Sequence, residues 1–346
     1  MSESKNGAAH ALSWVAPLII WYQNNARSLP WREDRDPYHV WISEIMLQQT
    51  RIETVMPYYA RFMNDYPTVE ALAEAPLEDV LKHWEGLGYY SRAKNLHKAA
   101  GLIAEMGGFP STYEEIRHLP GIGDYTAGAI AAIAFGLPET AVDGNVMRVV
   151  SRLQKLEEDV MLASSRKKVE ELLKASYPKE AAGAFVQGLM ELGEVICLPK
   201  SPKCEACPLQ SYCEAKKAGL QEALPVRIPK TKRRIEDRAV VIVRNAKGEV
   251  LVFKRPDNVV LGGLYELPNV EISPEADLPS VLNAIRDQYG FAPEKLTFKQ
   301  SAKHVFSHIT WNMRVFEAYS DEAGKGGIWA EKNAVMLPTA FRKLQD

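Results

Sequence analysis

The chain has 346 residues, 46% of them hydrophobic and 25% charged, which is enough apolar material for more than one globular domain. The formal net charge of −2 excludes a strong overall basic field, although a near-neutral total can hide a basic face. No window approaches about twenty unbroken apolar residues, and the first residues lack the basic start of a secretory signal, so we expect a cytoplasmic protein without a membrane span.

Residues 1–218 have apolar positions at three- and four-residue spacing, which predicts an all-α domain. Asp36-Pro37 is a helix start, because Asp accepts hydrogen bonds from free N–H groups and Pro suits the first helical turn. We expect one helix to follow over residues 38–55. This helix would carry the candidate residues Glu44, Leu47, Gln49 and Thr50.

Residues 119–130, LPGIGDYTAGAI, predict a tight turn followed by a helix of small residues that packs closely in a core. Gly121 and Gly123 allow the turn, and the next helix would open with free N–H groups. Such groups bind phosphate through their hydrogens and the helix dipole. An ordinary connection between two helices is the alternative.

All four cysteines of the chain fall in residues 197–213 with the spacing C-x6-C-x2-C-x5-C: Cys197, Cys204, Cys207 and Cys213. A reducing compartment disfavours disulfides. Four thiolates at short spacing suit either a structural zinc or a [4Fe–4S] cluster, and ligand chemistry alone does not separate the two.

Residues 219–236 contain prolines and a cluster of Lys and Arg, so they are predicted to form a basic interdomain linker, either solvated or crossing a phosphate backbone. The apolar pattern then changes to period two. Strands are expected at 239–245 and 249–256 about a turn at 246–248, and again at 308–319. An amphipathic helix at 278–289 would end at Gly290. Residues 237–346 are therefore predicted to form an α+β domain.

LPGIGDYTA and, about twenty residues later, VDGNVMRV (142–149) resemble the helix-hairpin-helix and the catalytic aspartate of DNA glycosylases of the endonuclease III superfamily. The resemblance implies that Asp143 lies beside the sugar of a flipped nucleotide. A carboxylate there stabilises the positive charge that develops when the glycosidic bond breaks. Without the resemblance, Asp143 is an ordinary helix cap. The resemblance also implies that the cysteines hold a [4Fe–4S] cluster.

Tyr125 stands just after the hairpin turn, where members of this superfamily that also cut the strand carry a lysine. The amine of that lysine attacks the sugar and forms a Schiff base. A phenol cannot form this imine. The sequence therefore predicts a monofunctional glycosylase that leaves an abasic site.

PWR (30–32), WISEIMLQQTRIETV (41–55) and WEGLGYYSR (84–92) resemble the adenine DNA glycosylase family called MutY. Adenine leaves poorly as an anion, so a general acid must protonate it, and a carboxyl group with a raised pKa is suited to this task. The resemblance implies that Glu44 is this acid. An exposed helix glutamate is the ordinary alternative.

The same resemblance assigns further roles by position. Tyr125 would orient Glu44, and Asn145 would support Asp143. The remaining assignments are the adenine pocket (Trp31, Arg32, Leu47, Gln187), the wedge that fills the gap in the DNA (Gln49, Tyr89), contacts to the opposing base (Thr50, Leu87) and phosphate contacts (Gly121, Gly123).

EVLVFKRPDNVVLGGLYELPNVEI (249–272) resembles the opening strands of the Nudix fold. The following helix, LPSVLNAIRDQYG, lacks the glutamate cluster that binds metal ions in Nudix hydrolases, so diphosphate hydrolysis is not expected. In the MutY family such a domain recognises 8-oxoguanine. The matching hairpin, KHVFSHITW (303–311), would use Phe306, Ser307 and His308. The domain is short, and we expect only a brief terminal helix.

Together these features predict a monomeric DNA repair glycosylase, associated with a bacterial-type nucleoid, that removes adenine opposite 8-oxoguanine or guanine in double-stranded DNA. Three alternatives remain open. An oxidised-pyrimidine glycosylase and lyase would be trapped by borohydride on damaged DNA. A scaffold without catalysis would tolerate Glu44→Gln. A nucleotide pyrophosphatase would release diphosphate from oxidised dGTP with magnesium.

Overall fold

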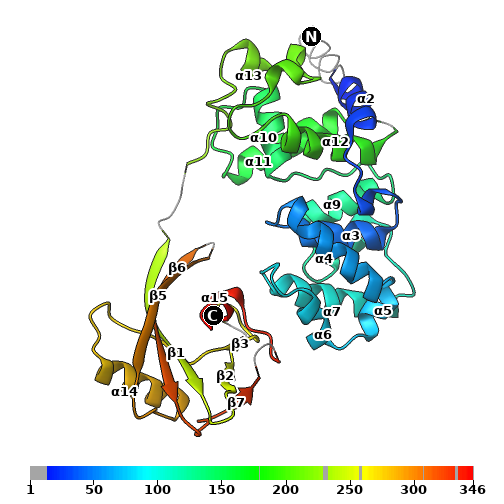
Figure 1. The fold of residues 1–346 in the computed structure, drawn as a ribbon. Coiled ribbons are helices and arrows are strands. Elements are labelled where there is room, and N and C mark those ends of the chain that lie inside the picture. Colours follow the sequence, from blue (N-terminus) through cyan, green and yellow to red (C-terminus); the bar gives the residue numbers. More distant parts are fainter. Residues whose placement is uncertain are drawn as a thin grey trace. The chain divides into compact units, whose positions relative to one another are not determined.

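A computed structural model of the chain describes residues 14–178, 180–228, 233–256, 259–306, 308–331 and 334–345. The chain divides into two compact units, one formed by Met1–Val80 with Ser91–Pro229 and the other by Leu81–Tyr90 with Lys230–Asp346 (Figure 1). Within the described ranges, no helix combines the length and the apolar character that a membrane crossing requires.

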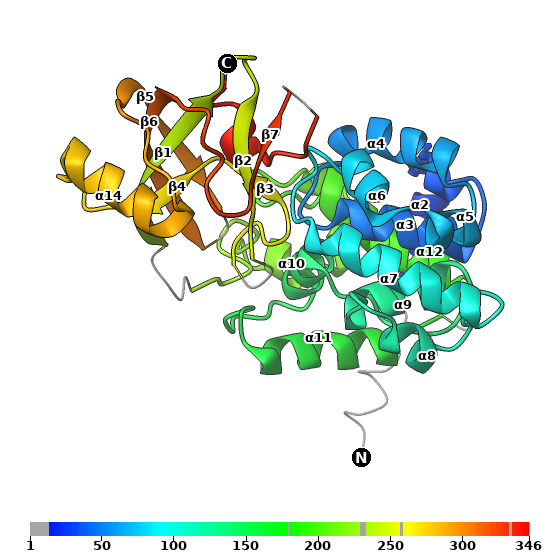
Figure 2. The same ribbon diagram turned by 90° about the horizontal axis from the view of Figure 1, so that it is seen from below.

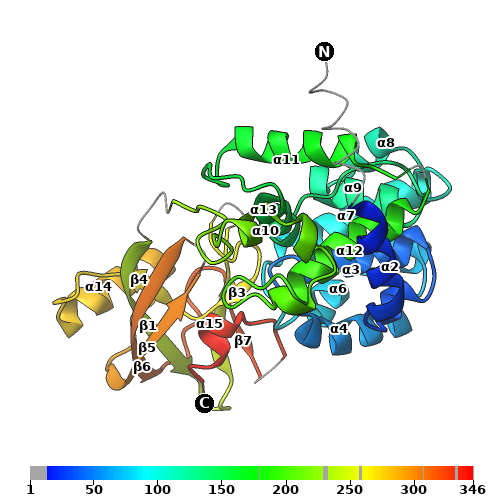
Figure 3. The ribbon, with the colours of Figure 1, turned by 90° about the horizontal axis from the view of Figure 1, so that it is seen from above.

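The first unit is helical, as the sequence predicts. Figures 1 and 3 both place α2 beside α12. Its elements, with α6 running into the second unit, are α2 (Val15–Asn25), η1 (Pro30–Arg32), α3 (Pro37–Leu47), α4 (Ile52–Asp65), α5 (Val69–Glu74), α6 (Leu77–His83), α7 (Ser91–Glu105), α8 (Tyr113–His118), α9 (Asp124–Ile133), α10 (Gly144–Leu153), α11 (Ala163–Ala175), α12 (Ala182–Val195), η2 (Cys204–Ala206), η3 (Gln210–Tyr212) and α13 (Glu214–Lys217).

Helix α3 begins where the sequence predicts but ends earlier. The Asp36 side chain accepts a hydrogen bond from the backbone N–H of Tyr38 at 2.8 Å, with Pro37 in the first turn. The expectation of one helix through residue 55 is wrong, because α3 ends at Leu47 and α4 starts at Ile52. Gln49 and Thr50 therefore lie in a turn and not on the helix of Glu44.

Arg92 of α7 explains the break. Its Nη1 donates to three carbonyl oxygens at the end of α3, those of Ile45 (2.7 Å), Met46 (3.0 Å) and Gln48 (2.7 Å). These carbonyls have no helical N–H to accept from where a helix stops, and the guanidinium supplies the missing donors. The chain then turns through Gln49 at φ 58°, in the left-handed region.

The turn between α8 and α9 requires glycine at position 121. Gly121 has φ +77°, and a Cβ there would lie 2.6 Å from Cβ of Asn95. Helix α9 is buried along its length from Thr126 to Ile133, which confirms the close packing predicted from its small residues. A Cβ at Gly128 would lie 2.0 Å from the carbonyl oxygen of Thr140.

In its described residues, the second unit contains a seven-stranded sheet with the order β3-β2-β1-β6-β5, in which β4 pairs with β1 and β7 pairs with β2. Strands β1 and β6 are parallel, and the other pairs are antiparallel. The elements are β1 (Arg234–Arg244), β2 (Val250–Lys254), β3 (Tyr265–Glu266), β4 (Asn269–Glu271), α14 (Leu278–Tyr289), β5 (Thr297–Val305), β6 (Ile309–Tyr319), β7 (Gly327–Ala330) and α15 (Thr339–Arg342). Strand β1 thus begins within the stretch expected to be linker.

A helix covers each face of this sheet (Figure 2). Helix α14 packs Val281 and Ile285 on the face that presents Val241, and α15 packs Phe341 on the face that presents Trp311. Gly290, at φ 73°, ends α14 as the sequence predicts. The period-two strands and the brief terminal helix are confirmed.

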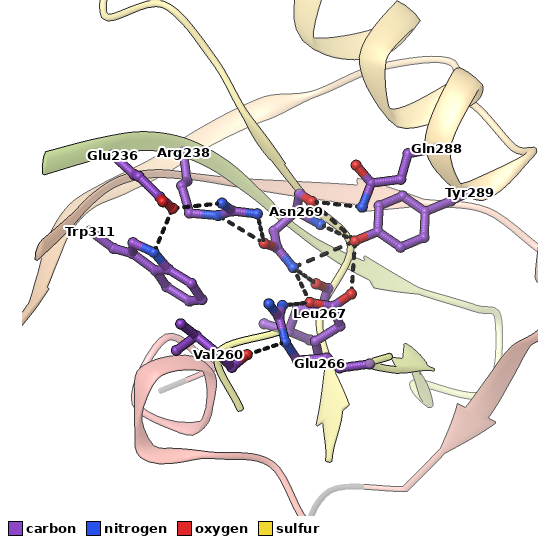
Figure 4. A network of polar contacts seen from close by, with 10 residues as sticks. Glu236, Arg238, Val260, Glu266, Leu267, Asn269, Gln288, Tyr289 and Trp311 are labelled. Atoms are coloured by element: carbon purple, nitrogen blue, oxygen red, sulfur yellow. Dashed lines mark hydrogen bonds and ion pairs between the residues drawn. The ribbon is translucent and has the colours of Figure 1, made fainter. Parts of the chain in front are cut away.

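A polar network is buried inside this unit (Figure 4). Arg238 donates to Asn269 Oδ1 at 2.7 Å and to Glu236 at 3.1 Å, and its guanidinium lies 4.7 Å from the centre of the Trp311 ring. Asn269 in turn donates to Glu266 at 2.7 Å. Because each charge has an oppositely charged or hydrogen-bonding partner, the network can remain in the core.

Candidate functional site

A cavity of about 700 Å³ lies in the helical unit. Its walls come from η1, the end of α3 and the following turn, the hairpin, α9, the start of α10, and α12. These elements bring together twelve of the residues predicted from sequence: Trp31, Arg32, Glu44, Leu47, Gln49, Thr50, Gly121, Gly123, Tyr125, Asp143, Asn145 and Gln187.

Glu44 is buried in this wall, with 8% of its surface exposed. The Tyr125 hydroxyl donates to Glu44 Oε2 at 2.7 Å. Burial raises the pKa of Glu44 to about 7, and the charge of Asp143 adds to this, while the Tyr125 hydrogen bond and the Arg32 charge oppose it. Near neutral pH, a substantial fraction of Glu44 therefore carries a proton that it can donate.

Asp143 caps the N-terminus of α10. Its Oδ1 accepts from the Val146 backbone N–H at 2.7 Å, and its Oδ2 accepts from Asn145 Nδ2 at 3.2 Å. Burial raises the pKa of Asp143, and these hydrogen bonds oppose the rise. Asp143 is therefore both a helix cap and a cavity residue. The N-terminus of α10 binds one carboxylate oxygen and so fixes the carboxylate at the cavity wall.

Arg148 fixes Asn145, the residue that hydrogen-bonds to Asp143. Its Nη2 donates to Asn145 Oδ1 at 2.7 Å and to the Gly193 carbonyl at 2.8 Å, and its Nε donates to the Cys197 carbonyl at 2.8 Å. One guanidinium therefore joins the carboxylate end of the cavity to the beginning of the cysteine loop.

Glu191 of α12 is a cavity residue that the sequence analysis missed. Its side chain is 1% exposed and forms ion pairs with Arg27 at 2.6 Å and Arg32 at 2.9 Å. The available signal was its position four residues after Gln187, on the same face of α12. Its partners lie more than 150 residues earlier, with separations of 164 and 159 residues, so no local pattern announces them.

The other predicted DNA contacts lie outside this cavity. Leu87 and Tyr89 belong to residues 81–90, which group with the second unit; Leu87 is buried, and Tyr89 is 45% exposed at φ 50°. Phe306 and His308 stand at the turn between β5 and β6, which confirms the predicted hairpin. The Phe306 ring packs 4.8 Å from the Trp311 ring, and His308 is exposed. Ser307 lies outside the described residues.

The four cysteines line one small pocket together with Arg152 and Lys216. None forms a disulfide, and Arg152 Nη1 donates to Cys197 Sγ at 3.3 Å. In the parts of the chain that the structure describes, no three His, Cys, Asp or Glu side chains converge as ligands of a single metal ion. Soft thiolate donors around a shared pocket, with two cations to offset their charge, fit an iron–sulfur cluster.

The comparisons with known families cover both units. Residues 42–179 match the HhH-GPD superfamily of base excision DNA repair proteins, and residues 239–346 match a NUDIX domain. Residues 197–213 match the iron-sulfur binding domain of endonuclease III. The cysteine segment is therefore an iron–sulfur binding loop.

Two curated adenine DNA glycosylases match over more than three quarters of their length. Adenine DNA glycosylase of Mus musculus is 35% identical, over 97% of this chain and 78% of that protein. Adenine DNA glycosylase of Buchnera aphidicola subsp. Schizaphis graminum is 33% identical, over 94% and 96%. Among solved structures, a thermostable thymine-DNA glycosylase aligns with a TM-score of 0.55 and 29% identity, over 61% of this chain and 98% of that one. On this evidence the chain belongs to the adenine DNA glycosylase family.

Proposed function

We propose that this enzyme excises adenine paired with 8-oxoguanine, or with guanine, from double-stranded DNA in base excision repair. One observation carries the proposal: in a single cavity, a buried Glu44 with a raised pKa and a Tyr125 partner accompanies an Asp143 fixed by a helix N-terminus. The cavity volume of about 700 Å³ is sufficient for a flipped nucleoside.

Bond cleavage begins with proton transfer. Glu44, in its neutral form, donates a proton to a ring nitrogen of the flipped adenine, which makes the base a better leaving group. Tyr125 keeps the carboxyl group in one orientation through its 2.7 Å hydrogen bond. Trp31 and Arg32 at η1, Leu47 of α3 and Gln187 of α12 surround the base.

The sugar then becomes an oxocarbenium ion, and the Asp143 carboxylate stabilises this charge or captures it as a covalent ester. Asn145 keeps the carboxylate in position at 3.2 Å. Glu44, now ionised, accepts a proton from the attacking water. Tyr125 replaces the lysine that a lyase needs, so the product is an intact strand with an abasic site.

DNA is gripped without regard to sequence by the hairpin. Gly121 and Gly123 are exposed, and Gly123 caps α9, which supports phosphate binding at this helix N-terminus. Gln49 and Tyr89, each in the left-handed backbone region, fill the gap that the flipped nucleotide leaves. The opposing 8-oxoguanine is recognised by Thr50, Leu87, Phe306, Ser307 and His308.

We infer that the cofactor of this loop would be a [4Fe–4S] cluster, which would cross-link the loop when bound. Cys197, Cys204, Cys207 and Cys213 would hold it. The four cysteines line one pocket, and the match of residues 197–213 to the iron-sulfur binding domain of endonuclease III supports an iron–sulfur cluster over zinc.

The proposal is tested by single-turnover release of adenine from duplexes with A opposite 8-oxoguanine, G or T. We expect the fastest release opposite 8-oxoguanine and none opposite T. The double variant Ser307→Ala, His308→Ala should remove the advantage of 8-oxoguanine over G and leave release opposite G unchanged. Equal rates on all duplexes would disprove lesion recognition, and no release from any duplex would disprove the activity.

A further inference from the structure

Glu191 gathers two arginines at one end of the catalytic cavity. Its Oε1 accepts from Arg27 Nε at 2.6 Å, and its Oε2 accepts from Arg27 Nη2 at 3.0 Å and from Arg32 Nη2 at 2.9 Å. The Arg27 backbone N–H adds a bond to Oε1 at 3.3 Å. These bonds occupy both oxygens of a carboxylate that is almost completely buried, and all three residues line the cavity.

The cluster of Glu191, Arg27 and Arg32 carries a net charge of +1, since one carboxylate faces two guanidiniums. Although burial opposes it, the two arginines hold the pKa of Glu191 below its ordinary value, so the carboxylate stays ionised through the neutral range. Arg32 is the cation of this cluster that acts on Glu44, where it favours the ionised form.

Other charged and aromatic groups lie near the two arginines and near Glu44. The negative charges of Glu194 on α12 and Glu53 on α4 favour the charged form of Arg27. The centre of the Tyr22 ring on α2 lies 5.7 Å from the Arg32 guanidinium. On the side of Glu44, Tyr125 of α9 donates its hydroxyl and Asp143 of α10 adds a negative charge. Glu191 differs from these groups in that its carboxylate accepts hydrogen bonds of 2.6–3.0 Å from both arginines.

We propose that Glu191 is a positioning residue for adenine excision, which fixes Arg27 and Arg32 at the cavity wall and offsets their charge so that Glu44 keeps its catalytic proton. This inference rests on the proposed function. A purely structural ion pair between η1 and α12 would affect only the stability of the fold. The proposed role also changes the pH range over which Glu44 stays protonated.

The test is a single-turnover pH profile of adenine release, from about pH 5 to 10, for the wild type and Glu191→Gln. In the variant the cluster carries +2, so the alkaline limb should move down by about one pH unit, and release above the limb should fall about tenfold. A purely structural role would lower the rate by one factor at every pH and leave the limb in place.

Charge compensation makes the test decisive. The double variant Glu191→Gln, Arg27→Gln returns the cluster to +1, so its limb should return toward the wild-type position. Arg27→Gln alone leaves the Glu191 carboxylate to offset Arg32, the cation that acts on Glu44, so the cluster charge falls to zero and the limb should move upward. Glu158→Gln is the matched control, because it removes the same charge from an ion pair with Lys168 outside the cavity lining and should not move the limb.

Circular dichroism of each variant reports folding. If Glu191→Gln does not fold, the upward shift of Arg27→Gln alone decides the question. An unmoved limb in every folded cluster variant, with normal adenine release by the wild type, would overturn the role of Glu191. Absence of adenine release by the wild type would instead refute the proposed function.

Discussion

Replacing Tyr125 with phenylalanine tests the electrostatic control of Glu44 directly. The substitution removes one hydroxyl and keeps the ring in place. That hydroxyl donates to Glu44 Oε2 at 2.7 Å and is one of the influences that hold the pKa down. A hydrogen bond to an ionised group contributes about 1.5–3 kcal/mol, which corresponds to about one to two pKa units. From its value of about 7, the pKa of Glu44 should therefore rise by about that amount.

The sign of the effect is specific. A higher pKa keeps Glu44 protonated to higher pH, so the alkaline limb of the single-turnover rate should move upward even if the plateau falls. Tyr177→Phe is a matched control, because the Tyr177 hydroxyl is bonded to the Glu139 carbonyl at 2.7 Å and neither residue lines the cavity. A limb that stays in place or moves down in Tyr125→Phe would refute the assignment of Glu44 as the acid held by Tyr125.

Three further outcomes follow from the same geometry. Glu44→Gln should stabilise the folded protein by about 3 kcal/mol at pH 8 and by much less at pH 5. The reason is that the pKa of Glu44 is raised from 4.5 to about 7 in the folded protein, so ionised Glu44 destabilises the fold above pH 4.5. Denaturant unfolding at both pH values measures the two gains, and equal gains would contradict the raised pKa. Gly121→Ala should weaken binding to undamaged duplex and destabilise the protein by about 1 kcal/mol or more, because φ at this position is +77° and the added Cβ would meet Asn95. DNA titration measures the affinity and denaturant unfolding measures the stability. Unchanged affinity would exclude the hairpin as a DNA contact. Cys207→Ala should lower the iron content and the visible absorbance of the purified protein relative to wild type, whereas full iron retention would show that this thiol is not a ligand.

Local patterns predicted several helices and strands, whereas the candidate site residues came from the family resemblance. Asp36-Pro37 and Gly290 marked helix ends through their own backbone chemistry, and these signals held. The error at Gln49 arose because the stop of α3 depends on Arg92, more than 40 residues later, whose guanidinium bonds the last carbonyls. Glu191 was missed for the same reason, because its ion pair joins residues 164 positions apart and the sequence around Glu191 contains no pattern that predicts such a partner.

The carboxylates were accessible from sequence because a family resemblance pointed to them, but their electrostatics were not. The burial of Glu44, its bond to Tyr125 and its exposure to the charge of Asp143 depend on how α3, α9 and α10 meet. Propensity and periodicity contain no information about such a meeting. It emerges only when the apolar faces of the helices pack together.

The most direct test of the central claim is the amount of free adenine released by the iron-loaded enzyme from a duplex with A opposite 8-oxoguanine, compared with Glu44→Gln and Asp143→Asn. The wild type should release adenine and leave an unbroken strand that alkali then cleaves. Both variants should bind the duplex and release adenine at least about a hundredfold more slowly. Release by either variant at the wild-type rate, or no release by the wild type, would contradict the catalytic roles assigned to Glu44 and Asp143.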